Sequence, residues 1–375
     1  HPEIDYGCVE HAYHTVPQLF EALEGKRELK DVAGLVYKED GEIKITPTQP
    51  VVFEDFPTPA RDLLPNELYA EFPTERKNFT VMITSLGCPF KCTFCEAGKT
   101  PYNPRSPKIV VDEMEECYRK HGVREIDIFD YDFTVDKKRV MDICAEMKKR
   151  KLDILWACRS RVDIDADMLA AMADAGCGRI YYGIESGLQE SLDRMQKGIT
   201  LEQVRQTIKV TKSLGMRALG FFIIGSPGDT RKSVKQTVKF AKSLDLDYVQ
   251  FSKCLAKPLT PLWKKMVEEE DQDYWAEWIK GNEKDRPLPR PWTELSNDEL
   301  DELAKWAYVS FHSRLSFLFK ATLKVRSFSE FRRKVQGFFE MVFSQEKVST
   351  EDKDFVAYHE PRKLDFYKKI AKWGK

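Results

Sequence analysis

Three cysteines within one short segment form the most reactive group of this 375-residue chain. Cys88, Cys92 and Cys95 have the spacing Cys-x3-Cys-x2-Cys and directly follow an apolar run. Thiolates at such spacing can bind three irons of a cubic 4Fe–4S cluster. Because no fourth ligand lies nearby, one iron would stay open, and a small molecule could bind and react there.

Two simpler interpretations of the cysteines are less favoured. A structural zinc site usually has four Cys or His ligands close together, but the histidine nearest to Cys95 is His121. A disulfide with one spare thiol is typical of secreted proteins, and no signal peptide is visible. The spacing therefore favours an iron–sulfur site.

Composition narrows the class of protein. Lys and Arg number 60 against 61 Asp and Glu, so bulk charge does not support a nucleic-acid partner. Hydrophobic residues make up 42%, but no apolar run is long enough to span a membrane. The six other cysteines lie in helix or strand patterns, which predicts that most of them are buried thiols and that the location is cytoplasmic. They are Cys8, Cys117, Cys144, Cys158, Cys177 and Cys254.

Apolar runs and amphipathic runs alternate through the middle of the chain. The predicted strands are 80–86, 125–130, 153–158, 179–184, 217–224 and 247–252. The predicted helices are 108–121, 136–150, 165–176, 200–214 and 230–244. Helix-boundary signals are a Thr200/Gln203 capping box, Asp163 or Asp165 as an N-cap, and Gly176 and Gly215 at helix ends.

Such strand–helix–strand repeats indicate parallel strands with right-handed crossovers. Six units predict an α/β fold, a partial (β/α)6 barrel of the TIM type. The cysteine loop follows the first strand, so it is expected at the C-terminal mouth, where barrel enzymes have their active sites.

Polar and glycine residues follow the other predicted strands, so they are expected at the same mouth. Each alone has a simpler explanation: Asp130 as a helix cap, Arg161 as a structural ion pair, Gly225 to Gly228 as a turn. The candidate site residues of this kind are Asp130, Arg161, Glu185, Ser186, Gly225 and Gly228.

Taken in order, these motifs resemble the radical S-adenosylmethionine superfamily, and within it the class that carries a cobalamin-binding domain. The resemblance covers about residues 15–265. The motifs that carry it are Cys88-x3-Cys92-x2-Cys95, Arg105-Ser-Pro, Phe129-Asp-x-Asp-Phe-Thr134, Trp156-x4-Arg161-Val-Asp163, Ala175-Gly-Cys177, Gly183-Ile-Glu-Ser-Gly187 and Gly225-x-Pro-Gly-x-Thr230.

The resemblance implies a 4Fe–4S cluster and S-adenosylmethionine as cofactors. Reductive cleavage would yield a 5′-deoxyadenosyl radical that modifies an unactivated C–H position, by methyl transfer or a related rearrangement. By the same resemblance, Phe94 would lie near the adenine, and Gly225 to Gly228 would line it. Asp130, Arg161, Glu185 and Ser186 are the other candidates for cofactor binding.

Two departures from the class are visible. Its preceding cobalamin domain, with the motif Asp-x-His-x-x-Gly, is missing, so cobalamin enters only if an upstream domain exists before His1. His11 and His14 are therefore expected to be surface residues. After the sixth predicted strand, the class has Pro-Gly-Thr, whereas this chain has Pro-Leu259-Thr.

Three regions are predicted. Residues 1–75 would hold the end of a cobalamin-type domain with a helix from Pro17 to Gly25, a hairpin at 35–45 turning at Asp40-Gly41, and a Pro-rich linker. Residues 76–265 would form the barrel. Residues 266–375 would be mainly helical and cover its mouth, with a capping box at Ser296. Their basic, aromatic part is expected to pack on the barrel rather than contact a membrane surface.

The expected partners are a small-molecule or lipid substrate and an electron donor such as flavodoxin or ferredoxin. Two alternative functions stay open. A methylthiotransferase would carry three further cluster cysteines, but only Cys8 precedes Cys88. A non-enzymatic iron–sulfur electron carrier would have a cluster with four protein ligands.

Overall fold

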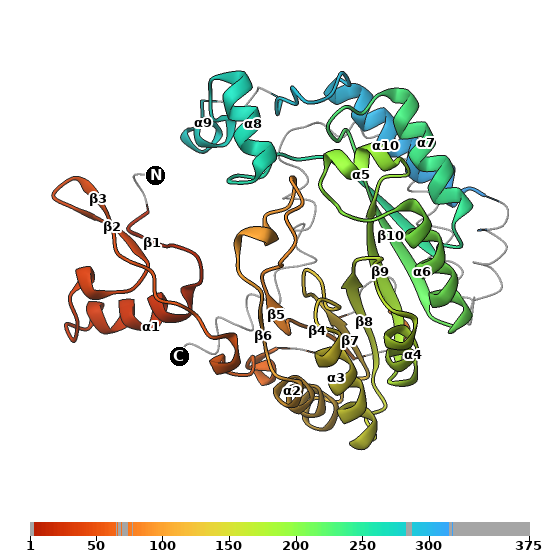
Figure 1. Ribbon diagram of the computed structural model, residues 1–375. Coiled ribbons are helices and arrows are strands. Elements are labelled where there is room, and N and C mark those ends of the chain that lie inside the picture. The colour runs from red at the N-terminus through yellow and green to blue at the C-terminus, as the bar shows by residue number, and fades with distance from the viewer. Residues whose placement is uncertain are drawn as a thin grey trace, which may run out of the picture.

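Six parallel strands form the central sheet of the computed structural model, in the spatial order β11-β10-β9-β8-β7-β4 (Figure 1). The strands are β4 (Phe79–Met82), β7 (Glu125–Ile128), β8 (Leu155–Ser160), β9 (Cys177–Glu185), β10 (Arg217–Ile224) and β11 (Tyr248–Lys253). The sheet is curled, and the predicted partial barrel is confirmed. The structure describes residues 4–64, 66, 69, 74–76, 78–282, 287–314 and 317.

Helices cover the convex face of the sheet. The five predicted helices are observed as α2 (Pro107–Lys120), α3 (Lys137–Lys149), α4 (Ala166–Asp174), α6 (Leu201–Ser213) and α7 (Arg231–Ser243). A short sixth helix, α5 (Gln189–Arg194), was not predicted. The Thr200 capping box is present, and Gly176 and Gly215 have the expected positive φ.

The predicted side-chain cap of α4 is not formed by Asp165. Asp165 does occupy the N-cap position of α4, but its side chain makes no capping hydrogen bond. Its carboxylate instead accepts a hydrogen bond at 2.7 Å from Nζ of Lys137, the first residue of α3.

The first strand is shorter than predicted. It ends at Met82, and residues 85–86 form a separate strand β5 (Ser85–Leu86), which pairs antiparallel with β6 (Asn103–Pro104). The chain bends because Thr84 and Ser85 are hydrogen-bonded to a side chain from the next strand, described below. The cysteine loop thus starts from a small hairpin rather than from the barrel strand itself.

The two faces of the sheet differ in character. Toward the helices, Ile126, Trp156 and Tyr182 are fully buried in the main apolar core. The concave face carries buried charges near the strand starts, where Arg179 forms an ion pair with Glu125. Higher on this face, Arg159 donates to Asp127 at 3.1 Å. The charged groups are paired, as burial requires.

The N-terminal part consists of a separate three-stranded sheet and one helix. Strands β1 (Tyr6–Cys8), β2 (Leu35–Glu39) and β3 (Glu42–Ile45) pair antiparallel beside α1 (Ala12–Leu23), which contains Pro17 instead of beginning there. Asp40 and Gly41 both have positive φ, as a two-residue hairpin turn needs, so the predicted hairpin is confirmed.

The C-terminal part that the structure describes is helical, as predicted. It comprises α8 (Pro261–Glu270), α9 (Tyr274–Lys280) and α10 (Asn297–His312), and the Ser296 capping box is present. Helix α10 packs on α7 and β11. The basic, aromatic stretch lies almost wholly outside the described residues. Within the described part of the chain, no helix has the length and apolar character needed to span a membrane.

A buried carboxylate ties the linker to the barrel. Glu113 of α2 is 3% exposed and accepts from Arg61 at 2.7 Å and from Arg105 at 2.5 Å. Changing Glu113 to Ala leaves two buried guanidinium groups without their acceptor, so we expect a loss of about 3–5 kcal/mol in the free energy of unfolding. Urea denaturation measures this value.

The matched control is Glu116→Ala on the same helix, where the ion pair with Lys120 is largely exposed. That change should alter the free energy of unfolding by less than about 1 kcal/mol. If both variants lose the same free energy of unfolding, the buried ion pairs of Glu113 stabilise the fold no more than the exposed pair of Glu116 does.

Candidate functional site

The cysteine loop is clamped from two sides. The Thr93 N–H donates to the Met195 carbonyl at 3.0 Å, and the Leu262 N–H donates to the Thr93 carbonyl at 3.0 Å. These partners lie just after α5 and in the first turn of α8. Within the loop, the Cys95 N–H donates to the Cys92 carbonyl at 3.1 Å. The loop is therefore held at the C-terminal end of the sheet, as expected.

The thiols of this loop differ from the other cysteines. Cys88, Cys92 and Cys95 are unpaired and half-buried, whereas Cys8 is exposed. The remaining five cysteines are buried, as predicted for them. Partial exposure gives the three loop thiols access to a bound group, which the buried thiols lack.

Asp130 holds the start of the loop. This carboxylate, at the end of β7, is fully buried and accepts four hydrogen bonds. They come from the N–H and hydroxyl of Thr84, both at 2.5 Å, and from the N–H and hydroxyl of Ser85, at 3.0 and 2.7 Å. Both oxygens of this predicted site residue are therefore already hydrogen-bonded to the protein at the start of the loop.

Arg161 has one donor to spare. Its Nε and Nη2 donate to Asp163 at 2.8 and 3.0 Å, and the guanidinium lies 3.8 Å from the centroid of the Phe90 ring. Its Nη1 is buried and has no partner among the described residues, and the same holds for Thr93 Oγ1 inside the cysteine loop. Buried polar atoms without partners indicate a missing ligand or water.

A buried ion pair joins Glu185 to a residue that the sequence did not predict. Lys197 Nζ lies 2.9 Å from Glu185 Oε1, and both side chains are buried. Glu185 adopts φ +67°, which is uncommon outside glycine. Gly183 makes room, because a Cβ there would lie 2.8 Å from Glu185 Oε1 and 2.9 Å from Lys197 Nζ.

These groups form one electrostatic environment with the cysteines. Burial raises the pKa of Cys92, while Lys197 and Arg161 act in the opposite direction. Burial also raises the pKa of Cys88, against a backbone hydrogen bond from Phe90. Thiolates at this loop would therefore be stabilised by a bound cationic cluster, helped by the two nearby cations.

The other predicted site residues lie in packed positions. Phe94 is half-buried, and it packs both against the main apolar core and against a second, smaller apolar core that includes Leu262 and Met266 of α8. Ser186 Oγ lies 3.2 Å from Thr237 Oγ1 and accepts from the Leu188 N–H. At the end of β10, Trp292 covers the loop: its indole N–H donates to the Gly225 carbonyl, and its carbonyl accepts from the Gly228 N–H, both at 2.8 Å.

The structure thus gathers Arg161 and Glu185 around Cys92 and places Asp130 beneath the loop. In the described part of the chain, no hydrogen bond or ion pair joins these residues to Gly225 or Gly228. Lys197 was missed because it follows a short, unpredicted helix and because lysine is usually exposed. Its only sequence signal is its place in the loop between α5 and α6.

The donor set fits a cubane better than a single ion. Among the described residues, no three His, Cys, Asp or Glu side chains are grouped to hold one metal ion. In a cubane, each thiolate binds a different iron, so the three sulfurs need not converge on one point. Three half-buried thiols beside a spare guanidinium N–H of Arg161 and the Thr93 hydroxyl suit a cluster with an anionic ligand.

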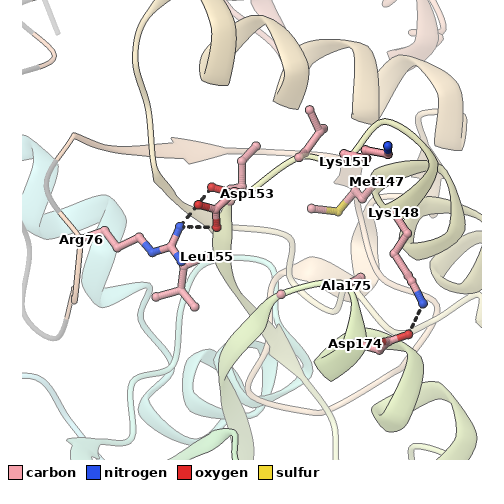
Figure 2. Close-up of a pocket in the computed structure, with 11 residues that line it drawn as sticks. Arg76, Met147, Lys148, Lys151, Asp153, Leu155, Asp174 and Ala175 are labelled. Carbon is pink, nitrogen blue, oxygen red and sulfur yellow. Dashed lines mark hydrogen bonds and ion pairs between the residues drawn. The ribbon is translucent and has the colours of Figure 1, made fainter.

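A separate hollow of about 190 Å³ lies at the other end of the sheet, where β8 begins and just before β9 (Figure 2). Its charged side chains are largely paired, Arg76 with Asp153 at 2.8 Å and Lys148 with Asp174. It is remote from the cysteine loop, and enzymes with barrel folds do not use this end for catalysis.

Comparison with known proteins agrees with this geometry. The radical SAM superfamily model matches residues 82–241. An uncharacterized methyltransferase of Pyrococcus horikoshii is 35% identical over 330 residues, which cover 86% of this chain and 70% of that protein. The anaerobic magnesium-protoporphyrin IX monomethyl ester cyclase of Rubrivivax gelatinosus is 31% identical and covers 63% of this chain, but only 43% of its own length is matched.

Solved structures share the fold. The radical S-adenosylmethionine methyltransferase TsrM from Kitasatospora setae matches with a TM-score of 0.59 at 20% identity, covering 71% of this chain and 54% of that one. The cobalamin-dependent enzyme OxsB matches with a TM-score of 0.61 at 20% identity, covering 90% and 55%. With its three-cysteine loop at the mouth of a six-stranded partial barrel, the chain belongs to the radical SAM superfamily.

Proposed function

We propose that this chain cleaves S-adenosylmethionine reductively at a 4Fe–4S cluster held by Cys88, Cys92 and Cys95, and modifies an unactivated C–H position of its substrate. The observation that carries the proposal is the three unpaired thiols beside the spare Nη1 of Arg161. When bound, the cluster and S-adenosylmethionine supply the radical chemistry, and the protein binds, orients and shields them.

The residues around the loop have distinct roles in this proposal. Arg161 and Lys197 attract the carboxylate of S-adenosylmethionine, because guanidinium and ammonium groups donate strong hydrogen bonds to carboxylates. Glu185 accepts from a ribose hydroxyl or holds Lys197 in place. Ser186 is the neighbouring candidate for the ribose, and Phe94 and the Gly225–Gly228 loop are candidates for the adenine surface. Asp130 positions the loop.

Methyl transfer is the favoured reaction. The Pyrococcus relative is named a methyltransferase, and a cytidylyl-2-hydroxyethylphosphonate methyltransferase of Streptomyces wedmorensis is 28% identical over 243 residues. A cyclisation or other rearrangement is the second candidate, since the Rubrivivax relative is a cyclase. Cobalamin would take part only through a domain preceding His1.

Two partners complete the reaction. Radical SAM enzymes need a reductant and a substrate. For this chain we propose a flavodoxin or ferredoxin as the one-electron donor and a small-molecule or lipid substrate. A methylthiotransferase activity is the other enzymatic alternative, because a Methanocaldococcus jannaschii protein that bears the name putative methylthiotransferase is 28% identical over 264 residues.

Activity is tested by anaerobic reconstitution with iron and sulfide, followed by S-adenosylmethionine and dithionite. We expect 5′-deoxyadenosine to accumulate in a reductant-dependent way, and chromatography measures it. An intact cluster that yields no 5′-deoxyadenosine would favour an electron carrier over an enzyme.

The ligand assignment is tested by changing Cys88, Cys92 and Cys95 singly to Ala. Each variant should lose most of its cluster iron and visible absorbance, because a cubane held by two protein thiolates is poorly retained. Cys8→Ala is the matched control, since this cysteine is exposed and distant in sequence. A full iron content in any of the three loop variants would contradict its role as a ligand.

Lys197→Gln tests whether the Lys197 ammonium group contributes to binding of S-adenosylmethionine. With the charge removed, we expect the Kd for S-adenosylmethionine to rise about tenfold, equivalent to about 1.4 kcal/mol. Equilibrium dialysis on the reconstituted protein measures it, and urea denaturation checks that the fold is kept. Lys197→Arg should retain most of the affinity.

Lys212→Gln provides the comparison, because Lys212 also pairs with a carboxylate, Asp247, but at the opposite end of the sheet. If Lys212→Gln and Lys197→Gln weaken binding equally, the effect is structural and not local to the site.

A further inference from the structure

The segment after β11 lies directly against the cysteine loop. Lys257 Nζ is 2.8 Å from Glu96 Oε1, and Lys99 Nζ donates to the Pro258 carbonyl at 2.5 Å. Both contacts involve residues that closely follow Cys95 in sequence. The surface formed by these two segments is therefore an outer wall of the proposed cluster site, next to its third cysteine.

This wall is locally basic, although the whole chain carries a formal charge of −1. Lys99, Lys257 and Lys264 are exposed, and the latter two lie close enough to Lys99 to act on its pKa. Burial lowers the pKa of Lys99, Glu96 and Cys95 oppose that lowering, and Lys257 and Lys264 add to it. Glu96, the acidic neighbour that acts on Lys99, is already paired with Lys257, and Glu268 lies one turn after Lys264 on α8. A concentration of like charge on an otherwise neutral protein favours an acidic partner.

Leu259, which follows Pro258 in the same segment, has an unusual backbone conformation. It has φ +67° and is 62% exposed, so a bulky apolar residue occupies a left-handed position and faces solvent. Its side chain gains little from packing in the chain itself. This is the position where the resembling class has glycine, which would adopt the same conformation without strain. Strain held at an exposed site points to a function.

Two further exposed groups with apolar surface belong to the same region: Leu255 in the segment after β11, and Tyr131. Leu255 is 41% exposed, and Tyr131, which follows β7, is 54% exposed. Burial raises the pKa of the Tyr131 phenol, and the nearby Glu96 and Cys95 raise it further, which places Tyr131 beside the same wall. Apolar residues surrounded by charged ones are the usual anatomy of a protein interface.

We propose that the basic wall, formed by Lys99, Lys257 and Lys264 around Leu259, is the docking surface for a small acidic one-electron carrier protein that reduces the cluster. This inference rests on the proposed function. One electron leaves the reduced cofactor of the carrier, which is oxidised by one electron, and enters the cluster. No covalent bond forms or breaks in this step.

The lysines and Leu259 contribute differently to docking. Long-range attraction by the lysines raises the association rate and makes it sensitive to salt. Leu259 acts as an apolar anchor in the centre of the contact, where binding energy concentrates. The position beside Cys95 brings a docked carrier close to the cluster without passing through the barrel mouth, which stays available to the substrate.

The test compares two reductants on the full, reconstituted chain. Anaerobic stopped-flow measures cluster reduction, as loss of visible absorbance, by purified flavodoxin hydroquinone and separately by dithionite. In the Lys99→Glu/Lys264→Glu variant, we expect the rate with flavodoxin to fall at least about tenfold and to lose its salt dependence. The rate with dithionite should stay at the wild-type value.

Leu259→Gly is the second variant, and it removes the anchor while relieving the backbone strain, so the fold is not at risk. Its rate with flavodoxin should fall about tenfold with unchanged salt dependence. The matched control is Lys265→Glu, which makes the same charge change one residue along α8, at a lysine 3.5 Å from Glu269. Its rate should stay within about twofold of wild type.

The outcomes separate the two proposals. Unchanged flavodoxin rates in both wall variants would overturn the docking surface and leave the proposed function standing. A change in oligomeric state with unchanged reduction rates would identify a second copy of the chain as the occupant and also overturn it. Failure of dithionite to generate 5′-deoxyadenosine in the wild type would refute the proposed function itself.

Discussion

The buried carboxylate of Asp130 is the constraint on which the site depends. It lies at the end of β7 and accepts four hydrogen bonds from Thr84 and Ser85, so it bends the chain away from β4 at this point. Arg139 of α3 reinforces the bend by donating to the Thr84 carbonyl and to the Arg105 carbonyl, both at 2.8 Å. The cysteine loop therefore leaves the barrel in a direction that two strands and a helix determine together.

At the mouth, each of the two buried cations is paired with a carboxylate, but one of their hydrogen-bond donors has no acceptor among the described residues. Arg161 is paired with Asp163, and Lys197 with Glu185, so the buried cations carry no net excess. Arg161 still has a buried donor without a partner in the described part of the chain. A site of this kind suits a ligand that carries its own carboxylate, because the carboxylate can accept from the donor that the protein leaves without a partner.

The sequence was informative where a local pattern dictates the result. The cysteine spacing, the alternating strands and helices, the Asp40-Gly41 turn and the capping boxes at Thr200 and Ser296 each depend on residues close in sequence. The site contacts depend on residues far apart. No local signal distinguishes Lys197, which is buried, from an ordinary surface lysine, or shows that Asp130 reaches back 46 positions to Thr84.

The same limit explains the mistaken boundaries. Residues 80–86 form an unbroken strand-like pattern, and tertiary hydrogen bonds of Asp130 and Arg139 hold the bend that divides it into β4 and β5. Asp165 has the right residue type for a helix cap, yet Lys137 attracts its carboxylate instead. In both cases, a partner distant in sequence overrode a local preference.

Fold and chemistry are separable in this protein because they use different residues. The main apolar core contains Cys117, Cys144, Cys158 and Cys177 but none of the three loop cysteines. The loop is attached to the barrel through backbone hydrogen bonds at Thr93, one to the turn after α5 and one from α8. A cluster bound there would stiffen a loop that is already anchored, so its loss should disturb the loop and α8 before the barrel. The contacts of α8 with the loop place the C-terminal helices within reach of any change at the cluster.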